Sequence, residues 1–306
     1  MSKDFQKYLG SLLLFGSNGI VASGIALSSL QVVLMRTLLG AVALMAVLGA
    51  CALRRRSAGQ GLEMRDHAGE VAALAVSGAA LGVGWIFLFA AYRLVGVGVA
   101  SLAYYCGPVI VMALSPVLFR ERLTAGKLLG FAMVLMGAFL VVAQGQAASL
   151  NPQGLALGGL SAVMYAVMVI ASKRAPHVGG IEAATVQLVA AFAAVAVCAV
   201  ATGDLPTVGA LAHANLASVL MLGLVNTGLG CYLYFSALGK LPVQRVAVCG
   251  YLEPLSAVVL SCLLLGEAVT PGRMLGTALI IGGAATCELL GKQGGLRLHL
   301  PRVARA

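Results

Sequence analysis

The chain has 306 residues, of which 60% are hydrophobic and only 10% are charged, and its mean hydropathy is +1.00. Soluble globular proteins carry about 25% charged residues, so this chain lacks the polar surface that soluble domains need. The composition excludes an ordinary cytosolic enzyme, a disordered protein and a secreted disulfide scaffold. It indicates a protein that is solvated by lipid.

Ten apolar segments follow one another along the chain, and each approaches the roughly 20 residues that a helix needs to cross a bilayer. They cover residues 8–27, 30–53, 71–92, 97–119, 125–145, 154–172, 181–201, 214–238, 244–265 and 271–291. Stretches such as 38–53 are continuously apolar, whereas the strands of a membrane β-barrel alternate apolar and polar residues. The sequence therefore predicts an all-α polytopic membrane protein with ten transmembrane helices.

The basic residues predict the orientation of these helices. If the N-terminus is cytosolic, the cytosolic segments hold 17 of the 20 Lys and Arg residues. The opposite side holds only Arg93 and Arg273, and Arg36 lies inside the second helix. The positive-inside rule then places both termini in the cytosol, with the chain in a bacterial-type inner (plasma) membrane. The net charge of +10 is explained by loops that face anionic lipid, so we expect no nucleic-acid partner.

No cofactor, metal or catalytic group is predicted. The 7 cysteines all fall inside predicted helices and show no Cys-x-x-Cys spacing, which is not the pattern of disulfides or zinc sites. The 4 histidines all fall in loops or in the C-terminal tail, at His67, His177, His213 and His299.

The chain contains an internal repeat. At a constant offset of 146, residues 82–138 match residues 228–284 without a gap. The matched pairs include Tyr105 with Tyr251, Pro108 with Pro254, Glu121 with Glu267, Gly130 with Gly276 and Gly137 with Gly283. We interpret the chain as two five-helix units, residues 1–150 and residues 151–306 with a cytosolic tail.

Because five is odd, the second unit is expected to enter the membrane in the opposite sense to the first. The charges agree with this expectation, since Arg120-Glu121-Arg122 corresponds to Gly266-Glu267-Ala268, which has lost both arginines. Inverted repeats of this kind are typical of secondary transporters. Their two similar halves can exchange roles, which is the physical basis of alternating access.

The chain also resembles a known family. The resemblance lies in the ten helices, the duplication, the stretch Arg-Thr-Leu-Leu-Gly-Ala at 36–41, and the segments Pro108 to Glu121 and Pro254 to Glu267. These features resemble the EamA transporters of the drug/metabolite transporter superfamily. One departure is Arg120, where that family usually has Gly before Glu. The resemblance implies a basket of helices around a central cavity, lined by the first, third, fourth, sixth, eighth and ninth helices, with the fifth and tenth at the periphery. It also implies export of small amino-acid-like metabolites.

Two prolines mark the depth at which a substrate is expected to bind. Pro108 and Pro254 lie near the middle of the fourth and ninth helices, and each frees the carbonyl four residues earlier, at Tyr104 and Gly250. Tyr104, together with the repeat mates Tyr105 and Tyr251, can offer aromatic faces and hydroxyls to an amine or amino acid. The alternative is that the prolines only shape the helices and that the tyrosines pack between them.

Two charged residues lie inside predicted helices. Glu253 is about ten residues into the ninth helix, where an ionised carboxylate costs roughly 2.5–3.5 kcal/mol. Glu253 is therefore our candidate for binding substrate and for coupling transport to a proton. Arg36 is the other intramembrane charge. The alternative is that Arg36 and Glu253, or Glu253 and a backbone group, form a structural bridge.

Further candidates are polar residues on the other predicted cavity helices, namely Asn18, Trp85, Tyr165 and Asn226. For the asparagines, interhelical hydrogen bonding is the alternative. Glu121 and Glu267 lie at equivalent helix turns, where a structural or gating role is expected, because a carboxylate complements the N-terminus of a helix.

These observations predict a secondary active transporter that exports a small amino-acid-like metabolite. The partners would be that substrate, the lipid bilayer and a proton as the candidate coupling ion, with the oligomeric state left open. One alternative is an importer of a cationic or zwitterionic nutrient. Another is a membrane enzyme or lipid-handling protein, which would need a catalytic group at membrane depth that the histidines do not supply.

Overall fold

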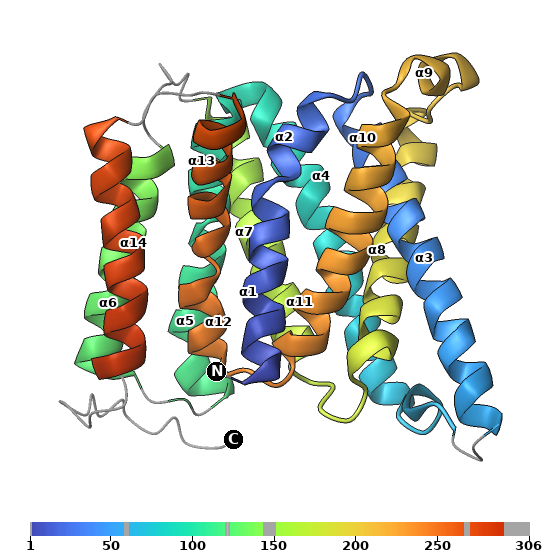
Figure 1. Ribbon diagram of the computed structural model, residues 1–306, viewed down its shortest axis with the longest axis horizontal. Helices are drawn as coiled ribbons and strands as arrows, with labels where there is room; N and C mark the ends of the chain where they lie inside the picture. Colours follow the sequence, from blue (N-terminus) through green and yellow to red (C-terminus); the bar gives the residue numbers. More distant parts are fainter. Residues whose placement is uncertain are drawn as a thin grey trace.

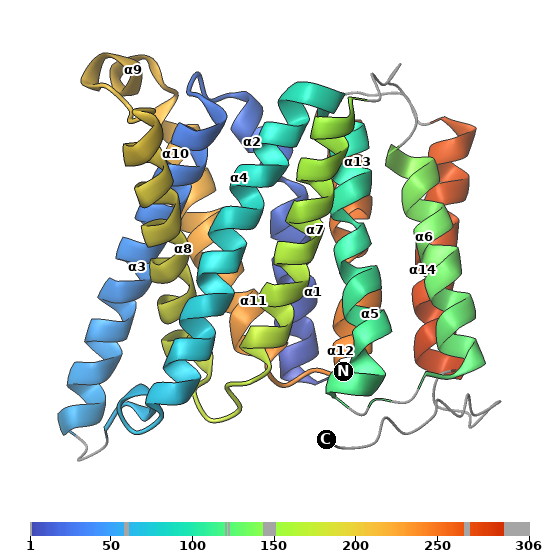
Figure 2. The same cartoon turned by 180° about the vertical axis from the view of Figure 1, so that it is seen from behind.

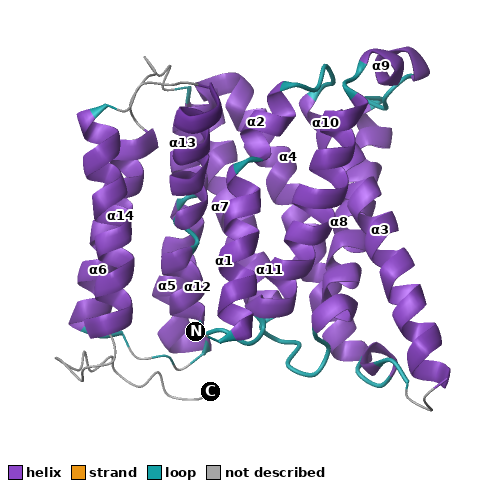
Figure 3. Ribbon diagram, viewed as in Figure 1, coloured by secondary structure: helices purple, strands orange, loops and turns teal. Residues whose placement is uncertain are grey.

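The structure is a computed structural model that describes residues 2–57, 61–119, 121, 123–142, 151–265 and 270–290. Within these residues the chain forms helices joined by short turns (Figure 3). The long helices run between the two ends of the molecule, as Figures 1 and 2 show from opposite sides.

Within the described residues up to 142, the chain forms seven helical elements. They are α1 (Lys3–Gly16), α2 (Asn18–Ser23), α3 (Ser29–Ser57), the short 3-10 helix η1 (Glu63–Arg65), α4 (Ala68–Tyr104), α5 (Cys106–Leu118) and α6 (Ala125–Val142).

The described residues from 151 to 290 form nine more. They are α7 (Pro152–Ser172), α8 (Gly180–Thr202), α9 (Val208–His213), α10 (Leu216–Leu220), the π-helical stretch η2 (Met221–Leu229), α11 (Gly230–Leu238), α12 (Val243–Cys249), α13 (Leu252–Leu265) and α14 (Pro271–Leu290).

Among the described residues, five helical stretches are long and apolar enough to cross a membrane, judged by length and composition. They are Ser29–Ser57, Ala68–Val95, Pro152–Ser172, Gly180–Thr202 and Leu216–Leu238. Shorter apolar helices lie in Cys106–Leu118, Ala125–Leu140 and Met274–Cys287. These helices fit a multi-pass membrane protein.

The first predicted helix is wrong as a single element, because the structure breaks it at Ser17 into α1 and α2. The Leu14 carbonyl at the break accepts hydrogen bonds from the Ser17 hydroxyl at 2.7 Å and from the Asn226 amide at 3.0 Å. Side chains thus satisfy the backbone where the helix is interrupted, as an apolar environment requires. The sequence pattern could not show this partner, since Asn226 is 212 residues away.

The predicted turn between 92 and 97 is also wrong, because α4 continues through it to Tyr104. The interruption comes instead at Tyr105, three residues before Pro108, which has no N–H to donate to the Tyr104 carbonyl. The second half is interrupted at the equivalent place. There α12 ends at Cys249, and the Gly250 carbonyl accepts a shorter-range bond from the Glu253 N–H at 3.1 Å.

The helices α6 and α14 pack directly against each other and lie side by side at one edge of the molecule in both views (Figures 1 and 2). A Cβ on Gly130 would lie 2.5 Å from the Gly283 carbonyl, and one on Gly137 would lie 2.6 Å from the Gly276 carbonyl. The earlier glycine of α6 therefore contacts the later glycine of α14, and the later one contacts the earlier one, so the two helices are antiparallel. Gly276 is the repeat mate of Gly130, and Gly283 is the repeat mate of Gly137. Swapping the two repeats therefore turns one contact pair into the other, as a local two-fold axis requires.

Two of the further contacts between the halves lie near the helix interruptions and at the start of α12. The Tyr251 hydroxyl donates to the Tyr105 carbonyl at 2.5 Å, so these repeat mates touch each other. The Glu121 carboxylate accepts hydrogen bonds from the Val243 and Gln244 N–H groups at 2.6 and 3.0 Å. A turn of the first half thereby caps the N-terminus of α12 in the second.

Because α6 packs closely on α14, replacing a glycine by alanine should change stability very differently at two positions. Gly130→Ala places a methyl group against a backbone carbonyl and should lower the unfolding free energy by about 1–3 kcal/mol. Gly159→Ala on α7, where nothing lies within 4 Å of the new Cβ, should leave stability unchanged or slightly raised. Thermal unfolding of both variants in detergent measures the difference, and equal melting temperatures would contradict this packing.

Candidate functional site

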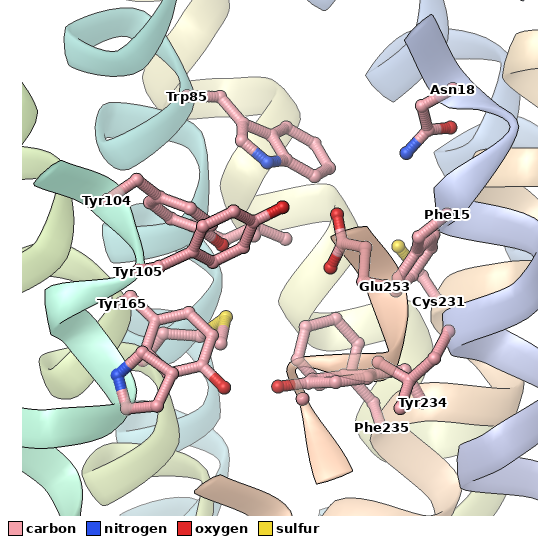
Figure 4. A pocket seen from close by; sticks show the side chains of 15 residues that line it. Phe15, Asn18, Trp85, Tyr104, Tyr105, Tyr165, Cys231, Tyr234, Phe235 and Glu253 are labelled. Carbon is pink, nitrogen blue, oxygen red and sulfur yellow. The ribbon is translucent and has the colours of Figure 1, made fainter. Parts of the chain in front are cut away.

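A central cavity of about 60 Å³ lies where the helix interruptions meet. Its walls come from both halves of the chain, on α1, α2, α4, α5, α7, α11 and α13 and at the two interruptions. The lining residues are Leu12, Phe15, Asn18, Leu81, Trp85, Tyr104, Tyr105, Pro108, Tyr165, Met168, Cys231, Tyr234, Phe235, Gly250 and Glu253 (Figure 4). The lining is mostly aromatic and apolar, and Glu253 is its one ionisable carboxylate.

Glu253 lies in the first turn of α13, directly after the interruption at Gly250 and Tyr251. Its carboxylate points into the cavity, toward the side on which the tyrosines lie (Figure 4). The N-terminal end of a helix favours a negative charge, and Arg36 attracts the carboxylate from a distance. Among the described residues, no hydrogen bond reaches the carboxylate oxygens, so they are available to a ligand.

Three tyrosines form one wall of the cavity. The Tyr104 and Tyr105 ring centroids are 5.6 Å apart, and those of Tyr104 and Tyr165 are 5.7 Å apart in an edge-on contact. Their hydroxyls point inward, and the Tyr165 hydroxyl faces that of Tyr234 (Figure 4). This arrangement presents ring faces for cation–π contacts together with hydroxyls for hydrogen bonds.

Arg36 does not line the cavity, but it supports a residue that does. Its guanidinium carbon lies 4.3 Å from the centre of the Trp85 ring, and its Nε donates to the Thr227 hydroxyl at 2.9 Å. The side chain is buried, and its Nη2 has no hydrogen-bond partner within the described part of the chain. Arg36 therefore fixes the position of Trp85 and brings a positive charge close to the cavity.

Four other predicted site residues, within the part of the chain that the structure describes, lie outside the cavity lining. Tyr251 is fully buried, with its ring packed against Phe131. Asn226 is buried and donates to Leu14, Ser17 and Asn18, so it holds the break between α1 and α2. Pro254 follows Glu253 in α13, and Glu121 lies at the cap of α12. Glu267 lies outside the described residues.

Sequence reasoning missed the wall that α11 provides, with Cys231, Tyr234 and Phe235. A signal for Phe235 was present, because it matches Phe89 in the repeat. Tyr234 carried no such signal, and its place depends on α11 packing beside α1, where its ring lies 5.4 Å from that of Tyr8.

One group of metal-ligating residue types occurs within the described residues, formed by His67, Glu70 and His177, whose ligand atoms lie within 4.8 Å of one another. Glu70 accepts from the His177 ring nitrogen at 2.6 Å and from the His177 and Val178 N–H groups at 2.9 and 3.0 Å. The Nδ1 of His67 is paired with the Glu63 carbonyl at 3.0 Å. These contacts account for the group as a clamp between two loops.

Two proteins that are similar in sequence to this chain are described as an exporter and an efflux pump. The protein described as aromatic amino acid exporter YddG, from Ancylobacter novellus, is 32% identical to this chain, over 68% of this chain and 72% of its own length. A probable amino-acid metabolite efflux pump of Salmonella typhimurium is 28% identical over 64% of this chain and 69% of its own. A solved crystal structure with 19% identity superposes with a TM-score of 0.78, covering 96% of this chain and 99% of the other, and so shares the fold.

The model of the EamA-like transporter family matches the chain twice, over residues 8–143 and over residues 152–287. The two matches together cover most of the chain, and they fall on either side of the proposed boundary at 150. A transporter of this family is a membrane protein that moves a small molecule and is not an enzyme. The chain belongs to the EamA-like transporter family.

Proposed function

We propose that this chain exports a small amino-acid-like metabolite across the inner membrane, by alternating access of two inverted five-helix halves. The observation that carries the proposal is the central cavity, in which an aromatic wall faces the single carboxylate of Glu253. A substrate amino group would bind this carboxylate and the tyrosine faces together, while its side chain would occupy the apolar part.

The architecture supports the mechanism. The two family matches, the antiparallel contact of α6 with α14 and the touching mates Tyr105 and Tyr251 all agree with halves that are related by a two-fold axis in the membrane plane. We extend this relation to the full ten helices, as residues 1–150 and residues 151–306. The basic loops favour cytosolic termini.

The direction of transport is proposed from the relatives, two of which are described as amino acid exporters or efflux pumps. The cavity of about 60 Å³ is far smaller than the roughly 300–1,000 Å³ of typical ligand pockets. Binding an amino acid therefore requires the walls to separate. The proposed mechanism supplies this movement, because the walls belong to both halves.

Tyr105 and Tyr251 should respond differently to replacement by Ala. Tyr105→Ala removes a ring that lines the cavity, so substrate affinity should fall about 10-fold or more with a small change in stability. Tyr251→Ala removes a fully buried ring and should lower the unfolding free energy by about 3–5 kcal/mol. Ligand titration and thermal unfolding of both purified variants separate the two effects. If both variants lose only stability, Tyr105 is a packing residue and the proposed wall is wrong.

Glu253→Gln should abolish proton-coupled transport, because the amide neither exchanges a proton nor carries the charge that binds an amine. The assay is uptake of labelled amino acids into inside-out membrane vesicles, with and without an imposed pH gradient. The matched control is Glu63→Gln, which removes an exposed carboxylate in η1. Expression and thermal stability should be unchanged in both variants.

Unchanged rates and pH dependence in Glu253→Gln vesicles would eliminate the coupling role. Glu253→Asp provides a second test, since it retains a carboxyl group at a shorter reach. It should keep pH-dependent transport at a reduced rate. Complete loss of transport in a normally folded variant would mean that the position of the carboxyl group matters more than its presence.

A further inference from the structure

Two loops from different halves of the chain meet at one end of the molecule. One loop contains η1 and leads into α4, and the other joins α7 to α8. Both lie at the lower end in Figure 1, where the N-terminus also lies. His67 and Glu70 come from the first loop and the first turn of α4, and His177 comes from the second loop. We call these three residues the loop clamp.

Each histidine of the loop clamp has one ring nitrogen in use. Nδ1 of His67 lies 3.0 Å from the Glu63 carbonyl oxygen, and Nδ1 of His177 lies 2.6 Å from a Glu70 carboxylate oxygen. A carbonyl and an ionised carboxylate can only accept, so in the neutral rings Nδ1 carries the proton and Nε2 keeps a lone pair. Within the described residues, no hydrogen bond reaches either Nε2. Metal-binding histidines are held in the same way, because their other ring nitrogen donates to a carbonyl or a carboxylate.

The three side chains are close enough to share one ion. One ligand atom from each lies within 4.8 Å of the other two, and the two imidazole rings stack with their centroids 4.8 Å apart. Ligand atoms around a tetrahedral zinc ion lie roughly 3.4 Å apart, so closing on an ion needs movements of at most about 1.4 Å. Side-chain rotation supplies such movements at this surface. The His177 side chain is 65% exposed, which also gives an ion a path to the ligands.

The backbone around the loop clamp is held in place from both sides. Glu70 also accepts hydrogen bonds from the His177 and Val178 N–H groups, at 2.9 and 3.0 Å, which ties the second loop to α4. Glu182 of α8 accepts from the Met64 N–H at 2.8 Å, which fixes η1. The three ligands are therefore positioned before an ion arrives, as a specific site requires.

The donor set selects the kind of ion. Two imidazoles and one carboxylate, with water in the fourth position, are typical ligands of Zn²⁺. Mg²⁺ and Ca²⁺ prefer a shell of oxygen ligands, whereas the loop clamp contains a single carboxylate. Glu182, which also contacts the first loop, pairs with Arg55 at 2.8 Å and so adds no free oxygen ligand. The clamp therefore favours a transition-metal ion over a harder cation.

We propose that the loop clamp binds a divalent transition-metal ion of the zinc class, through Nε2 of His67, one ring nitrogen of His177 and the Glu70 carboxylate. The bound ion joins the start of α4 in the first half to the α7–α8 loop in the second half. It therefore restrains the movement of one half against the other and slows transport. This consequence rests on the proposed alternating access, whereas the metal site itself does not.

The test uses the full chain, purified in detergent without a histidine tag and treated with a chelator, and titrates it with zinc chloride by calorimetry. The wild type should bind Zn²⁺ saturably, at one ion per chain, and should unfold at a higher temperature with zinc than without it. Magnesium chloride should have neither effect. The double variant His67→Asn/His177→Asn should bind Zn²⁺ about 10-fold or more weakly. An asparagine amide donates the hydrogen bond that Nδ1 donates but supplies no imidazole ligand, so this variant retains the clamp and loses the metal.

His213→Asn is the matched control. His213 also pairs through Nδ1 with the carbonyl four residues earlier, 2.8 Å from the Gly209 oxygen, but it belongs to no group of metal-ligating residues within the described part of the chain. This variant should bind zinc as the wild type does. Absence of saturable zinc binding in the wild type, or equal binding by the double variant, would overturn the proposal and leave a clamp held by hydrogen bonds alone. Equal stabilisation by magnesium would overturn the assignment to the zinc class. If the double variant fails to fold, Glu70→Gln decides the question, since its amide oxygen still accepts N–H groups and its zinc affinity should fall about 10-fold or more.

Transport in inside-out vesicles tests the restraint, since these vesicles expose the end at which the loop clamp is expected. Zinc should slow transport by the wild type and by His213→Asn, and a chelator should restore it. The double variant should transport at the same rate with and without zinc. Zinc that binds the purified wild type but leaves its transport rate unchanged would overturn the restraint. If the wild type transports no amino acid even without zinc, the proposed function fails, while calorimetry on the purified chain still decides the metal site.

Discussion

The constraint on which this structure depends is that backbone polar groups inside a bilayer must find partners within the protein. The chain nevertheless interrupts its helices at Tyr105 and again at Gly250 and Tyr251. Backbone groups at the interruptions find partners close by, since the Tyr251 hydroxyl donates to the Tyr105 carbonyl and the Glu253 N–H donates to the Gly250 carbonyl. The first of these bonds joins the two interruptions, and the cavity forms where they meet. Glu253 points into that cavity because it begins the helix after one of them.

Symmetry and asymmetry have different roles in this chain. Some contacts that join the halves involve repeat mates or pairs that exchange under the repeat, as at Gly130 with Gly283 and Tyr105 with Tyr251. The charges inside the molecule do not follow the repeat, because Gly107 stands where the second half has Glu253. A symmetric scaffold can alternate between two similar states, whereas a single carboxylate provides one site for one substrate. The proposed mechanism needs both properties.

Much of the architecture could be predicted from the sequence, because long apolar runs and a repeat with Pro, Tyr and Glu in register are strong local signals. One cavity is lined by six residues that the sequence singled out as aromatic, polar or charged within predicted helices, namely Asn18, Trp85, Tyr104, Tyr105, Tyr165 and Glu253. The break at Ser17 and the burial of Tyr251 could not be predicted, because both depend on partners far along the chain. Tyr234 joins the cavity through helix packing, which no sequence period records. The functional roles of these residues remain predictions.

The most direct test of the account is a metabolite profile of spent medium and cell extract, with and without expression of this chain. Export predicts that a few amine-bearing metabolites are enriched outside the cells and depleted inside them. Cells that instead accumulate a component of the medium would contradict export and favour an importer of a cationic or zwitterionic nutrient.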